Sequence, residues 1–189
     1  MFHELAFQIA KKAHSKQVDK AGKDYILHPM KVASYMDTDT EKTVAYLHDV
    51  LEDTKYTKED LLTEFNEDVV SLVLGASEKD KGLSWEERKT ETINTIKDFD
   101  LRHKAVVCAD KISNLEDMRI IFEIKGEKNF SAFKRGYEKQ KWYYTEVYNS
   151  LKYNINENNI MLNRLKLLID DIFNNRKNDE LEMEIFNIK

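Results

Sequence analysis

The chain has 189 residues, of which 41% are hydrophobic and 34% are charged, a balance typical of a globular domain with an ordinary apolar core. Its formal net charge of −5 argues against broad, sequence-independent binding to nucleic acid, which depends on a basic face. With only five glycines and one proline, the chain has few residues for tight turns, so we expect an all-α fold.

The sequence carries no sign of export or membrane insertion. Cys108 is its only cysteine, so no internal disulfide can form, which fits a reducing compartment. The first residues lack a basic segment followed by an apolar run, and no apolar stretch approaches the roughly 20 residues of a membrane span. We therefore predict a cytoplasmic protein that does not bind membranes.

The N-terminal part of the chain is predicted to form helices joined by polar loops. Apolar residues recur at helical spacing from Phe2 to Ala13, so the first helix is expected to end near His14. Residues 19–24 are polar and indicate a loop, and Pro29 suits the first position of the next helix.

Three further helices are predicted in the stretch that follows. Thr40 is expected to cap a helix that runs to about Asp53, because its hydroxyl can accept a bond from a backbone N–H group. Thr57 is expected to cap the helix after it. The apolar residues 69–73 indicate a short buried helix, which Gly75 is expected to stop.

The second half of the chain continues this pattern. Ser84 followed by Glu87 has the spacing of a capping box, so another helix is expected to start there. The remaining predicted helices are residues 101–118, 131–151 and 160–173, with loops at 79–82, 125–129 and 156–159. We divide the chain into a compact helical domain over residues 1–153 and a C-terminal helical extension over residues 154–189, which packs on that domain or trails from it.

Four potential metal ligands or acids lie within six residues of one predicted helix. Residues four apart share a helical face, so His48 lies beside Glu52 and Asp49 beside Asp53. Such crowding of acids is unfavourable unless a cation or a proton relieves it. Imidazole and carboxylate together suit a divalent ion that keeps room for water, so we predict a metal site.

Two more residues are candidates to complete this site. His28 precedes Pro29 at a loop-to-helix junction, and Asp110 lies on a later helix with Asn114 one turn beyond it. Taken alone, a histidine before a proline is more often a capping or core residue, and an aspartate in an apolar stripe often pairs with a lysine or arginine. The combination of the three segments favours a metal held by two histidines and two aspartates.

These motifs resemble the HD hydrolase domain of the RelA/SpoT homologues. Residues 47–54 resemble that family's LHDxxEDT block, residues 25–29 resemble its histidine–proline motif, and residues 109–117 resemble its ADKxxNLxD segment. Arg135 and Trp142, spaced seven apart, match a pair near the end of the small stand-alone ppGpp hydrolases. The resemblance runs from about residue 5 to residue 151 and implies an all-helical HD-domain bundle.

The resemblance also implies an activity and a set of site residues. The family hydrolyses the 3′-diphosphate of (p)ppGpp to GDP or GTP plus pyrophosphate, generally with Mn²⁺, so a small anionic nucleotide is the expected substrate. Carried over by motif, the metal ligands are His28, His48, Asp49 and Asp110. Glu52 and Asp53 would activate or orient the attacking water, and Asn114 would contact the substrate. Further candidates for substrate contact are Lys20, Lys23, Lys79, Lys81, Arg88, Lys89, Arg135 and Trp142.

Two alternatives remain beside a ppGpp hydrolase. Residues 17–20 depart from the Arg-Lys-Asp run with which the family grips the guanosine nucleotide, so the chain is alternatively an HD phosphohydrolase of another nucleotide or phosphorylated metabolite. A binding module that senses an alarmone is the non-enzymatic alternative, although such a module has no need of Glu52 and Asp53 beside a metal. Whether the chain forms a homo-oligomer is left open.

Overall fold

The computed structural model describes residues 1–20, 22–77, 82–125, 135–156 and 158–175. In these residues the chain forms helices and one isolated antiparallel bridge between Val18 and Asp24, so the predicted all-α fold is confirmed. No helix in the described stretches is long and apolar enough to cross a membrane.

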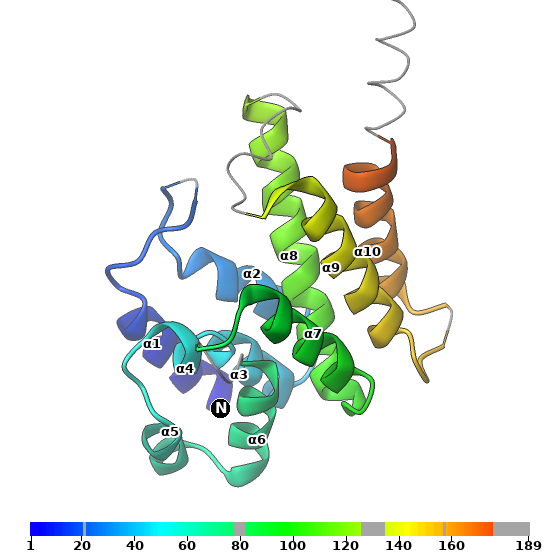
Figure 1. Ribbon diagram of the computed structural model, residues 1–189. Coiled ribbons are helices and arrows are strands. Elements are labelled where there is room, and N and C mark those ends of the chain that lie inside the picture. The colour runs from blue at the N-terminus through cyan, green and yellow to red at the C-terminus, as the bar shows by residue number, and fades with distance from the viewer. Residues whose placement is uncertain (21, 78–81, 126–134, 157, 176–189) are drawn as a thin grey trace, which may run out of the picture.

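The N-terminal half forms one group of helices (Figure 1). Its helices are α1 (Phe2–Ala13), α2 (Leu27–Ser34), α3 (Asp39–Leu47), α4 (Val50–Asp53), α5 (Lys58–Glu64) and α6 (Glu67–Ala76). Their inward side chains build a first core, which includes Ala10, Val44, Leu47 and Val73. Pro29 lies in the first turn of α2, where a missing N–H group costs no helical hydrogen bond.

The C-terminal half forms a second group around a second core. Its helices are α7 (Trp85–Ile96), α8 (Leu101–Lys125), α9 (Gly136–Leu151) and α10 (Ile160–Asp170), and a π-helical turn (Asp171–Asn175) follows. The second core includes Ile112, Leu115, Val147, Leu165 and Phe173. Part of the predicted C-terminal extension, α10, packs into this core, whereas residues 157 and 176–189 lie outside the described residues.

The long helix α8 joins the two groups. It contacts α2, α3 and α6 on one side and α9 and α10 on the other (Figure 1). Its side chains accordingly divide, because Val106 and Ala109 enter the first core while Ile112 and Leu115 enter the second. A residue in the middle of α8 therefore lies at the junction of both halves.

Helix starts were predicted with mixed success. The cap at Thr57 and the capping box at Ser84 are present as expected, and Thr57 also forms a capping box, with Asp60. The predicted cap at Thr40 is wrong: Thr38 is the N-cap of α3, and its hydroxyl accepts a bond from the backbone N–H of Glu41 at 3.2 Å. The Glu41 carboxylate in turn accepts a bond from the Thr38 backbone N–H, which completes a capping box at Thr38, two residues before the predicted cap.

Two predicted helix ends also differ from the structure. The helix expected to run to Asp53 is interrupted after Leu47, and the carbonyl of His48 accepts a bond from the Ser77 hydroxyl at 2.9 Å. Gly75 does not stop α6, which continues through Ala76. Of the other predicted segments, residues 78–81, 126–134 and the tail beyond 175 lie outside the described residues, and α9 is described from Gly136.

Candidate metal centre

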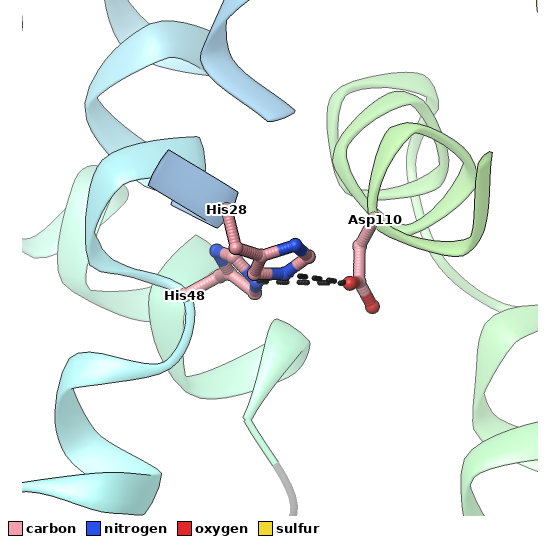
Figure 2. Close-up of side chains that lie close together, drawn as sticks. All are labelled: His28, His48 and Asp110. Carbon is pink, nitrogen blue, oxygen red and sulfur yellow. Dashed lines mark hydrogen bonds and ion pairs between the residues drawn. The ribbon is translucent and has the colours of Figure 1, made fainter. Parts of the chain in front are cut away.

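Four predicted ligands converge from three separate elements. His28 lies in the first turn of α2, His48 and Asp49 lie in the turn between α3 and α4, and Asp110 lies in the middle of α8. Figure 2 shows the two imidazoles pointing together toward the Asp110 carboxylate. One ligand atom from each of His28, His48 and Asp110 lies within 4.8 Å of the other two.

His28 and His48 both direct their Nε2 atom toward the centre of this group. Their Nε2 atoms are 3.3 Å apart, and His28 Nε2 lies 3.2 Å from Asp110 Oδ1. Two nitrogens that each lie about 2.1 Å from one tetrahedral ion are about 3.4 Å apart, close to the separation of these two Nε2 atoms. His48 Nδ1 donates to the Ala45 carbonyl at 2.7 Å, and because a carbonyl only accepts, this bond leaves Nε2 to face the centre.

Asp49 contacts the same imidazoles from a second direction. Its Oδ2 atom lies 3.0 Å from His48 Nε2 and 3.7 Å from His28 Nε2. Tyr25 donates its hydroxyl to the same oxygen at 2.5 Å. Asp49 does not belong to the group of three within 4.8 Å, so it lies beside the trio rather than inside it.

Asp110 is held at both of its oxygens. Asn114 donates its side-chain amide to Oδ1 at 2.6 Å, and the buried ammonium of Lys111 lies 2.5 Å from Oδ2. Asn114, which was predicted to contact substrate, therefore also orients a candidate ligand. The ion pair with Lys111 agrees with the alternative that Asp110 is an ion-pair residue. The same carboxylate also contacts His28, so Asp110 has both kinds of partner.

Opposite charges stabilise each other in this buried cluster. Burial raises the pKa of Asp49, but the charge and hydrogen bond of His48 lower it, to about 2. Burial lowers the pKa of His48, but the carboxylates of Asp49 and Asp110 raise it, to about 9. The cluster thus favours anionic carboxylates, and a divalent ion bound by His48 would take the place of the imidazole proton.

The two acids of the predicted water-activating pair differ in position. Glu52 is half-buried and lines a cavity together with His48, Asp49 and Asp110. Asp53 is exposed, and its backbone carbonyl accepts a bond from the Gln17 amide at 2.7 Å. Glu52 is therefore the acid that shares a cavity with the candidate ligands.

Two cavities border the candidate ligands. The small cavity has a volume of about 80 Å³ and is lined by His48, Asp49, Glu52, Arg88 and Asp110, among others. The large cavity has a volume of about 490 Å³, and its walls include Tyr25, His28 and Asn114 together with Tyr144 and a row of apolar residues on α8. The large cavity falls in the size range of small-molecule sites, roughly 300–1,000 Å³.

The remaining substrate candidates fall into three places. Lys20 and Lys23 line the large cavity, and Arg88 lines the small one. Lys89, Arg135 and Trp142 line neither of these two cavities. They contact aromatic rings instead: Lys89 lies over Tyr143, and Arg135 and Trp142 lie against Trp85. Lys79 and Lys81 lie outside the described residues.

Sequence reasoning missed several residues that orient the site. Tyr25 lies within a motif that was noticed, and Lys111 and Ser113 lie within another, but none of them was assigned a role. Ser113 places its hydroxyl 3.1 Å from His28 Nδ1. The proximity of these residues to the ligand motifs was the available signal, whereas their contacts depend on how the helices pack.

A family model for the HD domain matches residues 6–128, about two thirds of the chain. The chain belongs to the HD-domain family. It is 36% identical over 126 residues to a Mycobacterium leprae protein named probable GTP pyrophosphokinase, a match that covers 62% of this chain and 16% of that protein. It is 35% identical over 120 residues to a Borreliella burgdorferi protein named guanosine-3′,5′-bis(diphosphate) 3′-pyrophosphohydrolase, covering 58% of this chain and 18% of that relative. This HD-domain protein thus spans less than a fifth of the length of either relative.

Two solved protein structures align with this HD-domain protein over nearly their whole length. A Listeria monocytogenes EGD-e protein aligns with a TM-score of 0.72 and 35% identity, covering 77% of this chain and 98% of that one. A metazoan orthologue of SpoT, described as hydrolysing ppGpp, aligns with a TM-score of 0.75 and 26% identity, covering 93% of this chain and 95% of that one. The second likeness extends beyond the family match into the C-terminal helices.

Proposed function

We propose that this HD-domain protein is a metal-dependent phosphohydrolase that releases pyrophosphate from the 3′ position of guanosine-3′,5′-bis(diphosphate). The convergence of His28, His48 and Asp110 beside a cavity of nucleotide size carries the proposal. The names of the Borreliella relative and of the metazoan structure support the choice of substrate. We also propose a cytoplasmic location, in keeping with the single, buried Cys108.

The donor set fits a divalent metal ion, and we propose Mn²⁺ with His28, His48, Asp49 and Asp110 as its ligands. Two imidazole nitrogens and carboxylate oxygens suit a borderline or hard divalent ion. Tyr25, Ser113 and Asn114 hold three of these ligands in place through hydrogen bonds. When bound, such an ion makes water nucleophilic at neutral pH and polarises a phosphoryl oxygen.

The side chains of this protein supply the proton transfer and the grip on the substrate. Glu52 accepts a proton from the attacking water, and Asp53 helps to orient that water. The water oxygen bonds to the phosphorus attached to the 3′ oxygen, and the bond between that phosphorus and the sugar oxygen breaks. The sugar oxygen keeps the electron pair and takes up a proton, so the products are GDP and pyrophosphate. Lys20 and Lys23, at the large cavity, hold the 5′-diphosphate.

A panel of substrates tests this proposal. The Mn²⁺-loaded protein would be incubated with ppGpp, pppGpp, deoxynucleotides and NADPH, and released phosphate and pyrophosphate would be measured separately. Pyrophosphate released from ppGpp is the expected result. Phosphate released from another member of the panel would instead support the alternative HD phosphohydrolase, and tight ppGpp binding without turnover would support an alarmone-binding module.

Loss of a ligand should remove the metal and the activity together. We expect Asp110→Ala to bind no metal after dialysis, as measured by elemental analysis. The Asp110→Ala change also removes the carboxylate that pairs with the buried Lys111 ammonium. His28→Gln therefore serves as a second variant, because it leaves the Lys111–Asp110 ion pair intact. Glu123→Gln, which changes an exposed carboxylate on the same helix, is the matched control. Full metal content in both ligand variants would contradict the assignment.

A further inference from the structure

Glu52 reaches the small cavity from a helix of a single turn. Helix α4 comprises only Val50–Asp53, and the backbone N–H of Asp53 donates to the Asp49 carbonyl at 2.9 Å. One turn gains about one hydrogen bond for the backbone freedom that it loses, so it is not stable in isolation. The position of Glu52 therefore depends on contacts that other segments make with α4.

The segment that follows α1 supplies such contacts. Gln17 is half-buried, and its side-chain amide donates to the Asp53 carbonyl at 2.7 Å. Its backbone carbonyl accepts a bond from the Tyr25 N–H at 3.0 Å, and the Tyr25 hydroxyl donates to the Asp49 carboxylate at 2.5 Å. Gln17 is thus bonded directly to the last residue of α4 and, through Tyr25, to the residue just before its first. The stretch that carries the proposed base is held at both ends.

A buried histidine fixes the direction in which the Gln17 amide points. His14 Nδ1 lies 2.7 Å from Gln17 Oε1. The Asp53 carbonyl can only accept, so Gln17 turns its NH₂ group toward α4 and its oxygen toward His14. His14 Nδ1 must then carry the hydrogen of its bond to Gln17. The donors form one chain from His14 through Gln17 to the end of α4.

The other ring nitrogen of His14 shows that stability alone does not explain this residue. The side chain is 2% exposed, and its Nε2 atom is buried with no hydrogen-bond partner among the described residues. A buried nitrogen without a partner opposes folding, whereas an apolar side chain of similar size would carry no such cost. The imidazole is therefore best explained by the bond that it donates to Gln17.

We propose that Gln17 is a positioning residue, oriented by His14, that holds α4 so that the Glu52 carboxylate stays at the small cavity. This role rests on the proposed function, in which Glu52 is the base. Gln17 and His14 line neither of the two cavities, so they act through α4 and not on the substrate. The backbone bond from Tyr25 does not depend on the Gln17 side chain, so substitution at Gln17 should leave the metal bound.

Gln17→Glu tests the bond to α4 with almost no change in volume. The new carboxylate can still accept from His14 but cannot donate to the Asp53 carbonyl. With full Mn²⁺ content confirmed by elemental analysis, we expect kcat for ppGpp to fall about tenfold or more, because a small misplacement of a reacting group has effects of this size. KM should change less than about threefold. Gln8→Glu makes the same exchange at an exposed position of α1 and should change neither constant.

A double substitution tests whether the effect passes through Glu52. Glu52→Gln already removes the proposed base, so the further change Gln17→Glu should slow that variant by less than about twofold. A loss in the double variant equal to the product of the two single losses would mean that Gln17 does not act through Glu52, and would overturn the inference.

Two substitutions of His14 test its part in the chain of donors. His14→Asn supplies an amide nitrogen in place of Nδ1, since both nitrogens are bonded to Cγ, and should keep kcat within about threefold of the parent protein. His14→Leu has no donor and should lose about as much as Gln17→Glu. Urea unfolding of both variants guards against a folding defect. Equal losses in two stably folded variants would contradict the orienting role of His14.

Amide hydrogen exchange tests the hold on α4 without any substrate. In Gln17→Glu the Asp53 amide should exchange at least about tenfold faster than in the parent protein, while the amide of the buried Val44 on α3 should exchange as before. If no panel member is hydrolysed but exchange at Asp53 rises in this way, the proposed function fails and the hold of Gln17 on α4 stands. Unchanged exchange at Asp53 would overturn the positioning role.

Discussion

The ligand candidates depend on neighbours that hold them in position. Tyr25 donates to Asp49, and burial together with the Asp49 charge raises the Tyr25 pKa, so its hydroxyl stays protonated as a donor. Lys111 and Asn114 contact the two oxygens of Asp110. Such contacts fix ligand orientation before an ion binds, which lowers the cost of organising the site.

A change at Glu52 should separate chemistry from metal binding. We expect Glu52→Gln to keep its metal, because the residue shares the cavity but is not one of the proposed ligands. Turnover should fall by roughly a hundredfold or more, the usual loss when a general base is removed. Asp53→Asn, which alters an exposed residue outside both cavities, should lose less. Unchanged turnover in Glu52→Gln, measured as pyrophosphate release with saturating metal, would exclude it as the base.

At the scale of single elements, α6 shows why a glycine can persist inside a helix. A Cβ atom at Gly75 would lie 2.5 Å from the ring Nε2 of His103 on α8. The His103 ring is itself stacked on Phe99 at 4.7 Å and bonded to Asp100, so it has little freedom to move. The glycine permits α6 and α8 to approach closely beside the small cavity.

Replacing Gly75 should therefore destabilise the protein despite the gain in helix propensity. Alanine is favoured over glycine by about 1 kcal/mol in a helix. The clash with His103 should outweigh this gain and cost about 1–3 kcal/mol. Urea unfolding of Gly75→Ala measures the effect. In a His103→Ala background the same change should become neutral or stabilising, and an equal loss in both backgrounds would show that His103 is not the cause.

Glu116 links three helices through its carboxylate. Tyr35 on α2 donates to it at 2.9 Å, Lys31 on α2 lies 3.1 Å away, and Arg164 on α10 forms a further ion pair. Burial raises the pKa of Glu116, but these hydrogen bonds lower it below its usual value. A lowered pKa means that the folded state favours the charged form.

The stability that Glu116 contributes should consequently depend on pH. It is fully present above the unfolded pKa of about 4.3 and is lost as the pH falls through the lower folded value. We expect Glu116→Gln to be less stable than the parent protein by about 1–3 kcal/mol at pH 7, and the difference should shrink toward pH 3. Urea unfolding at both pH values measures it. A difference independent of pH would show that the carboxylate charge is not responsible.

At the scale of the whole molecule, the C-terminal helix completes the second core. Leu165 and Leu167 are two residues apart on α10, yet Leu165 is fully buried while Leu167 is 70% exposed. The family match ends at residue 128, so this part of the core lies beyond it. The two leucines offer a matched comparison of buried and exposed positions on one helix.

Truncating these leucines should have very different effects. Leu165→Ala should destabilise the protein by about 2–5 kcal/mol, because it leaves a cavity in the core. Leu167→Ala should change the free energy of unfolding by less than about 0.5 kcal/mol. Thermal and urea unfolding would report both. Similar losses in the two variants would mean that α10 does not pack in the second core as described.

Local signals explain which parts of the fold could be predicted. The cap at Thr57 and the capping box at Ser84 depend on residues only a few positions apart, and both were predicted correctly. The break after Leu47 was missed, because the His48 carbonyl is engaged by Ser77, a residue 29 positions later. The role of Gly75 was missed for a similar reason, since the ring it accommodates belongs to α8.

The sequence by itself determined that the chain is helical and which residues carry metal-type chemistry, since residue types and short spacings are local properties. Tertiary structure decided that His28, His48 and Asp110 meet, that Glu52 shares their cavity, and that Arg88 and Lys20 face different cavities. These facts depend on how α8 packs between two cores. Packing is a sum of many weak contacts between distant segments, and no single motif encodes it.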